Sequence, residues 1–597
     1  DSFTYKAPED TMNEVSPTWV WKGEWNRTLK NNMYAEVRYG VFGYAFPLVG
    51  YSNAPFISDS GRGTSQGGDS QNQTDRDRKQ INGALSYFKD NLLGGSHSLK
   101  FGLEQQYETQ FDGYLRVRAN NIEQQFNNGV ANRVVLGFPT AVNHVGDKGD
   151  RENLLSIGKI DTTSAFASDQ WSIGRVTLNL GVRWDRYKSY IPEQQQLAYS
   201  NGPIALPAVT FPEQTFFVWN SFVPRAGVVW NMAADGRTVL KVNYGYFKHN
   251  PGPGIAQAAN PNQPQKTATY TWTDKNGDGL YQKGEEGTLV SSALAGTITV
   301  DPAISQPYTH EVSTFVERTV TNDIGMQAGF VYKTNDNNWQ RYQPFRPASA
   351  YTTPFSIVDR GVDGVVGTSD DRTLTFYGIP NAALGKADTV IQNTPSIGRY
   401  KTFQISANKR MSHHWSAGFG FSYSWIRENA RSLASNTISS ALAGPGSYPN
   451  SINDALYTGD PTNGTLTFTQ WGFNTYGSVE LPWSVRISPV LRAQAGQAYG
   501  RTISVSAPSS CACFASGTEL VEPLDSNRMD NVMVFDIRGE KTIGLGGTKK
   551  IKLFADAYNL LNNASAEINK WGTGLTYTQP TAIVAPRIGR FGVRIEF

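Results

Sequence analysis

The segment 274–285 has the residue types and the spacing of a calcium-binding loop. In such a loop, side-chain oxygens at positions 1, 3, 5, 9 and 12 converge on one hard cation, and glycine at position 6 permits the sharp turn. The flanks show no helix pattern, so the usual pair of helices is not expected. A turn rich in Asp, Asn and Gly that binds nothing is the alternative. The pattern predicts these calcium ligands: Asp274, Asn276, Asp278, Leu280 (through its carbonyl), Gln282 and Glu285.

A second acidic segment, 359–371, resembles the aspartate-rich calcium repeats of extracellular proteins. Its glycines at 361, 364 and 367 would allow tight winding around an ion. The alternative is a solvated acidic turn. For both segments we expect calcium to stiffen a long loop and to take no part in catalysis. The predicted ligands here are Asp359, Asp363, Asp370 and Asp371.

Catalytic chemistry has little support in this sequence. Its six histidines are scattered, and no nucleophile elbow, phosphate-binding loop or CxxC pair is present. We therefore expect no enzymatic activity. The two cysteines, Cys511 and Cys513, are too close together to staple a large fold, and they could form a local disulfide or stay reduced.

The composition indicates a large all-β protein. Only 18% of the residues are charged, 12% are aromatic and 58 are glycine. The sequence has no apolar run of the length that a transmembrane helix needs. Its mean hydropathy is −0.42, which a membrane β-barrel tolerates because about half of each strand can be polar. A net charge of +3 is too small to indicate nucleic-acid binding.

The last strand-like segment shows the arrangement most directly, because its residues alternate between apolar and charged from 590 to the end. Successive side chains of a strand point to opposite faces, so one face would meet lipid and the other water. Phe591, Val593, Ile595 and Phe597 would share the apolar face. The charged side chains expected on the wet inner face, in this strand and in others, are Lys100, Glu104, Arg183, Asp185, Arg590, Arg594 and Glu596.

The same alternation recurs in pairs of segments joined by short turns, and long polar connections separate the pairs. We count about 17 strands in this pattern. It predicts an all-β fold, a transmembrane antiparallel β-barrel with short periplasmic turns and long extracellular loops. Both calcium segments would then lie outside the cell. The expected extracellular loops are 45–78, 109–158, 188–220, 248–308, 334–398, 428–465, 500–531 and 562–587.

Several segments resemble TonB-dependent receptors of the Oar-like outer-membrane barrel family. They are KGEWNR at 22–27, GVRWDRY at 181–187, VPRAGV at 223–228, GRTVLKVNYGY at 236–246, FADAYNLLN at 554–562 and the final strand. The resemblance implies a 22-stranded barrel that contains a plug, an N-terminal domain and a segment that contacts TonB. With about 17 strands, residues 1–597 would be a partial barrel, with the plug and the first strands missing from this chain.

The resemblance also implies a function. We expect an integral protein of the outer membrane of Gram-negative bacteria that takes up a scarce ligand, with energy delivered by TonB through the plug. The alternative is an outer-membrane scaffold, adhesin or protein-export component that uses calcium-stiffened loops; a passive porin is a weaker third reading. The expected partners are membrane lipid and lipopolysaccharide, the protein's own plug, TonB, and other outer-membrane or surface proteins. Nucleic acid is not among them.

Overall fold

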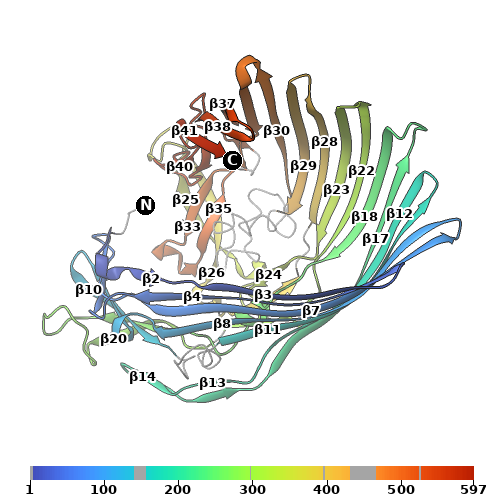
Figure 1. Ribbon diagram of the computed structural model, residues 1–597. Helices are drawn as coiled ribbons and strands as arrows, with labels where there is room; N and C mark the ends of the chain where they lie inside the picture. The colour runs from blue at the N-terminus through green and yellow to red at the C-terminus, as the bar shows by residue number, and fades with distance from the viewer. Residues whose placement is uncertain are drawn as a thin grey trace.

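One large antiparallel sheet dominates the computed structural model (Figure 1), which describes residues 5–139, 156–295, 297–386, 388–393, 397–429, 465–522 and 526–597. Segment β2 lies in the same register as β3 along β4, so the two form one strand, and the sheet has the 17 strands that the sequence predicts. Its members are β2 (Met12–Glu14), β3 (Thr18–Lys30), β4 (Met33–Gly50), β7 (Gln71–Leu92), β8 (Gly95–Arg116), β11 (Ser156–Ile173), β12 (Val176–Ile191), β17 (Gln214–Asn231), β18 (Thr238–Lys248), β22 (Tyr308–Thr321), β23 (Ile324–Asp336), β28 (Ile397–Ser412), β29 (Trp415–Asn429), β30 (Thr465–Leu481), β31 (Val485–Gln494), β37 (Val532–Gly546), β38 (Lys549–Tyr558) and β41 (Ile588–Glu596).

The sheet is curved but does not close on itself. Each strand pairs with the strands before and after it in the chain order given above. Among the described residues, β3 pairs only with β4, and β41 pairs only with β38. Figure 1 shows the resulting gap between the blue and the red edges. The sheet is therefore most of a barrel wall with two open edges.

Short turns and long connections occupy opposite ends of the sheet. The turn between β11 and β12 is closed by Gly174 at φ 56°, and that between β37 and β38 by Gly547 at φ 62°; this left-handed backbone suits glycine. Glu596 pairs with Lys550 just after the second turn, so the chain ends at the short-turn end, as the sequence predicts. The strands extend further into the connections than the sequence pattern indicates. Apart from residues 296, 387 and 523–525, the described connections are 51–70, 117–139, 192–213, 249–307, 337–393, 495–531 and 559–587. The expected loop 428–465 falls almost wholly outside the described residues.

The two faces of the sheet differ in polarity. One face presents large apolar side chains to the surroundings: Trp21, Leu103 and Phe591 are 70%, 69% and 86% exposed. The other carries most of the charged and small polar side chains, because successive residues of a strand alternate between faces. An apolar face this broad is not compatible with water and indicates contact with lipid. None of the helices in the described residues is both long and apolar enough to cross a membrane.

The long connections form smaller sheets of their own. The largest contains β1 (Tyr5–Lys6), β6 (Thr64–Gln66), β5 (Phe56–Asp59), β9 (Ile122–Asn127), β10 (Val130–Phe138), β19 (Lys266–Trp272) and β20 (Glu286–Ala293). The first calcium segment links β19 to β20. The remaining groups are β13 (Gln194–Gln196) with β16 (Val209–Phe211), β14 (Tyr199–Asn201) with β15 (Ile204–Leu206), β21 (Ile298–Val300) with β27 (Thr389–Asn393) and β24 (Trp339–Tyr342), β25 (Thr353–Asp359) with β26 (Arg372–Pro380) and β34 (Cys513–Phe514), β32 (Ala498–Tyr499) with β36 (Asn527–Arg528), β33 (Thr502–Ser506) with β35 (Ser516–Leu520), and β39 (Ala566–Asn569) with β40 (Pro580–Ile583).

Candidate functional site: the polar face and the loops above it

Ion pairs cross the polar face near its N-terminal edge. Glu36 accepts hydrogen bonds from Arg38 at 2.9 Å and from Lys100 at 2.7 Å, and Arg38 also reaches Glu24 at 3.2 Å. Lys100 stands on β8, two strands from Glu36. It can reach across because the intervening strand β7 presents the small side chain of Ala84 there. The sequence predicts the position of Lys100, and the structure supplies its partner.

A second set of charges joins β8, β11 and β12. The Arg183 guanidinium lies 3.4 Å from Glu104 and 2.7 Å from Asp185, both of which were expected on this face. Asp185 is buried and also accepts a hydrogen bond from the Ser164 hydroxyl at 2.5 Å. Every charge here has an opposite charge within reach, so these residues brace neighbouring strands against each other.

The C-terminal strands repeat the arrangement around Asp556, which lies between Arg538 at 2.6 Å and Arg590 at 2.7 Å. Glu596 pairs with Lys552 at 2.8 Å and with Arg594 at 3.2 Å. All seven charged side chains that the sequence places inside therefore lie on the polar face, and they form a cross-strand ladder.

Uncharged polar side chains cover the stretch of this face between the charged groups. A groove of about 400 Å³ across β28–β31 is lined by residues that include Gln404, Ser406, Ser422, Asn474 and Gln494. A second groove of about 490 Å³ crosses β8–β22 and is lined by residues that include Lys100, Gly181, Arg225, Gly227 and Glu311. Gly and Ser alternate with larger residues along these strands, and this pattern in the sequence is a signal for the grooves. The face is thus hydrophilic from one edge of the sheet to the other.

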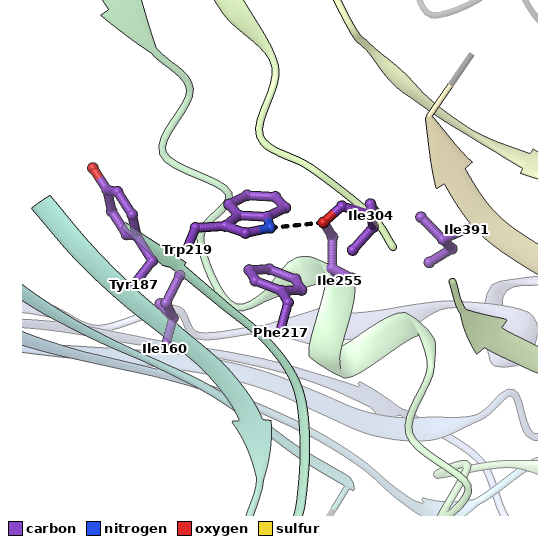
Figure 2. Packing of buried hydrophobic residues seen from close by; sticks show 7 residues of the cluster. All are labelled: Ile160, Tyr187, Phe217, Trp219, Ile255, Ile304 and Ile391. Atoms are coloured by element: carbon purple, nitrogen blue, oxygen red, sulfur yellow. Dashed lines mark hydrogen bonds between the residues drawn. The ribbon is translucent and has the colours of Figure 1, made fainter. Parts of the chain in front are cut away.

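The connection 249–307 folds over the polar face. Figure 2 shows Ile255 of its short helix α1 (Gly254–Ala258) near Phe217 and Trp219 of β17. The Trp219 indole donates a hydrogen bond to the carbonyl of Ile304 at 2.9 Å. The buried cluster that attaches the connection consists of Ile160, Tyr187, Phe217, Trp219, Ile255, Ile304 and Ile391.

Buried polar contacts fix the same connection. Gln257 donates to the Ser156 hydroxyl at 2.7 Å, and Asn260, fully buried, donates to Gln194 at 3.0 Å. Gly158 is required on β11, because a Cβ there would lie only 2.7 Å from the Gln257 backbone nitrogen. The connection 249–307 therefore packs directly against the sheet. No pattern in the sequence predicts this packing.

The first calcium segment forms a compact turn that gathers its predicted side chains. Asp274 accepts hydrogen bonds from the amides of Gly277 at 2.7 Å and Gly279 at 2.8 Å. Glu285 accepts from the amides of Lys275 at 3.0 Å and Gln282 at 2.9 Å. These contacts turn the carboxylates towards the inside of the turn.

Asp278 occupies the centre of that turn. It accepts hydrogen bonds from the Leu280 amide at 2.8 Å and from the side-chain amides of Asn276 at 3.0 Å and Gln282 at 2.8 Å. The Leu280 amide and these side chains hold the pKa of Asp278 below its usual range, and the Gln282 and Lys275 amides do the same for the pKa of Glu285. A carboxylate oxygen that accepts one N–H keeps a second lone pair. Carboxylate and amide oxygens of this kind are the ligands that calcium prefers in proteins.

The second calcium segment, between β25 and β26, separates its four predicted ligands. Asp363, Asp370 and Asp371 lie around Thr368, whose hydroxyl is 2.7 Å from Asp370 and 3.5 Å from the other two. Asp359 is fully buried and engaged by arginines, so it does not join them. In the described part of the chain, no group of three or more His, Cys, Asp or Glu side chains is placed to hold a metal ion. Calcium binding by either segment therefore stays a prediction.

Asp359 belongs instead to a buried junction of three long connections. Its carboxylate faces the guanidinium of Arg501, which also contacts Glu522 at 3.1 Å and Thr573 at 2.6 Å. Burial raises the pKa of Asp359, but hydrogen bonds from Arg501 and Arg372 outweigh it, and the net pKa lies below the usual value. The junction ties together the connections 337–393, 495–531 and 559–587.

The nearby cysteines, Cys511 and Cys513, form a disulfide. Cys513 is buried in an apolar cluster with Phe355, Phe376 and Val505, which joins β25–β26 to β33. Of the two states that the sequence leaves open, the structure has the oxidised one. The disulfide closes a local loop within the connection 495–531, and the apolar cluster adds a second attachment between two of the connections that Arg501 joins.

The solved structures that match this chain include outer-membrane transport proteins. The chain is 13% identical to the outer membrane transporter YddB from Escherichia coli, with a TM-score of 0.56, and the match covers 99% of this chain and 64% of that one. The ferric-catecholate import receptor Fiu from E. coli K12 is 12% identical, with coverages of 98% and 64% and a TM-score of 0.48. The siderophore receptor PiuA from Acinetobacter baumannii is 11% identical, with coverages of 98% and 65% and a TM-score of 0.48. The chain thus spans somewhat less than two thirds of the length of these proteins.

No curated protein matches the sequence. A family model described as an outer membrane beta barrel domain matches residues 4–483, which is most of the chain. This match agrees with the 17-stranded sheet, its exposed apolar face and its polar opposite face. The chain belongs to the outer membrane beta barrel domain family and is an integral protein of the outer membrane.

Proposed function

We propose that the protein is the barrel of a TonB-dependent receptor that takes up a scarce ligand across the outer membrane. The observation that carries the proposal is the wide, open sheet, polar on one face and apolar on the other, with a fold similar to that of the transporter YddB. Edges such as those of β3 and β41 are unfavourable in hydrocarbon, where unpaired backbone groups find no partner. Further strands of the same receptor would pair with these two edges and close the wall.

The hydrophilic face would surround a plug in this proposal. Charged groups that are already braced in pairs, such as Glu36 with Lys100, can contact a polar plug without leaving a lone buried charge. The two grooves of about 400 and 490 Å³ offer space for plug side chains. TonB would act through that plug. The finer assignment to the Oar-like type rests on the sequence resemblance alone.

The long connections would face the outside and capture the ligand, and the short turns would face the periplasm. Calcium held by Asp274, Asn276, Asp278, Leu280, Gln282 and Glu285 would stiffen the link between β19 and β20. A weaker ion site at Asp363, Asp370 and Asp371 would do the same between β25 and β26. Extracellular calcium sites need only millimolar affinity, because calcium is plentiful there.

An uptake assay tests the proposal. Two strains would be compared, a deletion strain that lacks the protein and the parent strain that has it. Each would be given radiolabelled ferric siderophores, oligosaccharides and peptides in turn, with and without a protonophore. We expect the deletion to abolish accumulation of one class, and the protonophore to abolish the same accumulation in the parent. Unchanged uptake of every class, together with stoichiometric co-purification of a surface protein, would contradict uptake and support the scaffold role.

A further inference from the structure

The apolar face of the large sheet changes character near its long-loop end across β18–β29. Alternating residues place the central side chains Val312, Phe330 and Phe403 on this face, and they are 39–42% exposed. One or two positions further along the same strands, the side chains on this face become basic. These basic side chains are Lys248, His310, Arg399, Lys401 and Arg427.

Two of these cations oppose each other directly. Arg399 of β28 and Arg427 of β29 are register partners, and Lys401 lies two residues from Arg399 on the same face. Like charges in such a pair destabilise a sheet. Arg399 is balanced by Asp336 at 2.9 Å. Arg427 and Lys401 are exposed, and within the described ranges no carboxylate lies in ion-pair reach of either. The patch therefore carries an excess of positive charge on the side that faces lipid.

Aromatic rings accompany the cations. His310 stacks on Tyr246 at 4.6 Å between ring centres, and the Lys248 ammonium lies 5.4 Å from the Tyr246 ring and 5.2 Å from the Tyr308 ring. Trp425 is the register partner of Lys401. Tyrosine and tryptophan rings concentrate at the level of the lipid headgroups. The row of cations thus lies where hydrocarbon gives way to headgroups.

We infer that this patch binds the phosphate groups of a phosphorylated lipid in the outer leaflet. Guanidinium groups bind phosphate in a bidentate manner, and an ammonium adds a point charge. A phosphate group placed between Arg399, Arg427 and Lys401 would attract all three cations and offset the repulsion among them. The acyl chains of the lipid would cover Phe403 and Phe330. The inference rests on the proposed orientation, with long loops outside, but it does not depend on ligand uptake.

The test uses the protein isolated from outer membranes in a neutral detergent, with diphosphoryl lipid A as the probe and native mass spectrometry as the readout. We expect binding to weaken at least tenfold in the variant Lys401→Gln/Arg427→Gln. The control is Arg27→Gln/Lys89→Gln, which removes two cations from the same face at the short-turn end; it should bind as the parent does. Binding by the parent should also fall as salt increases, because exposed charges are screened.

Three further arms determine whether the phosphorylated lipid is the occupant. Dephosphorylated lipid A should bind at least tenfold more weakly than the diphosphoryl form, and inorganic phosphate at the same concentration should not displace it. Equal binding by the two double variants, or equal binding of the two lipids, would overturn the inference. So would retention of an acidic surface protein that lipid A does not displace. If a variant fails to fold, the salt titration of the parent still tests the inference, because binding through charges should weaken as salt increases.

Discussion

Asp359 and Arg501 are 142 residues apart in the sequence, yet they form a buried ion pair in which Nη2 lies 2.8 Å from Oδ2. Neither side chain is more than 3% exposed. The pair holds the β25–β26 hairpin to the connection 495–531, and Thr573 adds the connection 559–587. The ion pair and Thr573 therefore link all three of these connections at one place.

Replacing Asp359 by Asn should loosen these connections and leave the large sheet intact. The substitution leaves the buried Arg501 with Glu522 alone as its charged partner, and breaking a buried pair costs about 3–5 kcal/mol. We expect faster hydrogen exchange in 353–380 and 501–521, measured by mass spectrometry, with unchanged exchange in β7 and β8. Arg360→Gln is the matched control, because Arg360 is exposed and lies next to Asp359. Equal exchange in the two variants would show that the junction carries no stability.

The same junction should respond to acid. The folded-state pKa of Asp359 lies below its usual value of 3.8, so its stabilisation is fully present above about pH 4 and is lost as the pH falls through the lowered pKa. Cleavage by pepsin within 353–380 should therefore increase as the pH is lowered below 4. The Asp359→Asn variant should be cleaved readily throughout that range, with no such step. A step of the same size in that variant would point to another carboxyl.

Calcium binding by the first segment can be tested with one substitution. Asp278→Asn removes the central carboxylate of the turn and should weaken calcium binding at least tenfold, as measured by titration calorimetry on the full chain in detergent. Glu286→Gln is the control, since it removes the same charge one residue beyond the predicted ligands. Glu286 contacts Tyr281 and the Gly284 amide. Calcium affinity that is unchanged by Asp278→Asn would contradict the site.

On the polar face, ion pairs whose side chains are more buried should stabilise the sheet more than exposed ion pairs do. The Glu36 side chain is 11% exposed and binds two cations, whereas that of Glu24 is 46% exposed. We expect Glu36→Gln to lower the free energy of unfolding by about 1–3 kcal/mol, because Arg38 and Lys100 lose their shared acceptor. Glu24→Gln should have a smaller effect, since solvent screens exposed pairs. Urea unfolding in lipid vesicles would measure both, and the reverse order would contradict the ladder.

The exposed apolar face should not tolerate charge. Leu103 of β8 lies on that face, and Leu103→Arg should destabilise the protein by about 2–4 kcal/mol if the residue is near the membrane midplane. Leu575, in the connection 559–587, is still more exposed, but it lies outside the sheet. The same substitution there should leave the unfolding free energy in vesicles nearly unchanged. Comparable losses at both positions would argue against lipid contact at Leu103.

The strands could be predicted because lipid and water impose an alternation that is visible in each segment by itself. Phe591 and Arg590 reveal their faces without knowledge of any partner. The connections could not be predicted in the same way. Local spacing predicts that Asp359 is a calcium ligand. In the structure Asp359 instead forms an ion pair with Arg501, which lies 142 residues away in the sequence. Likewise, the close approach of the Gln257 backbone to Gly158 could not be predicted, because it depends on how a loop folds over the sheet.

The pairing order of the large sheet bears on how the wall assembles. Each strand lies beside its neighbours in the chain, so the sheet can grow hairpin by hairpin through contacts of modest sequence separation, which favours fast folding. The two ends of that order, β3 and β41, are its most distant members. With further strands paired to these two edges, as proposed, the seam that finally closes the wall would carry the largest loop-closure entropy, since the cost rises with the length of chain enclosed. Wall formation would be local throughout, and only the final seam would be a long-range event.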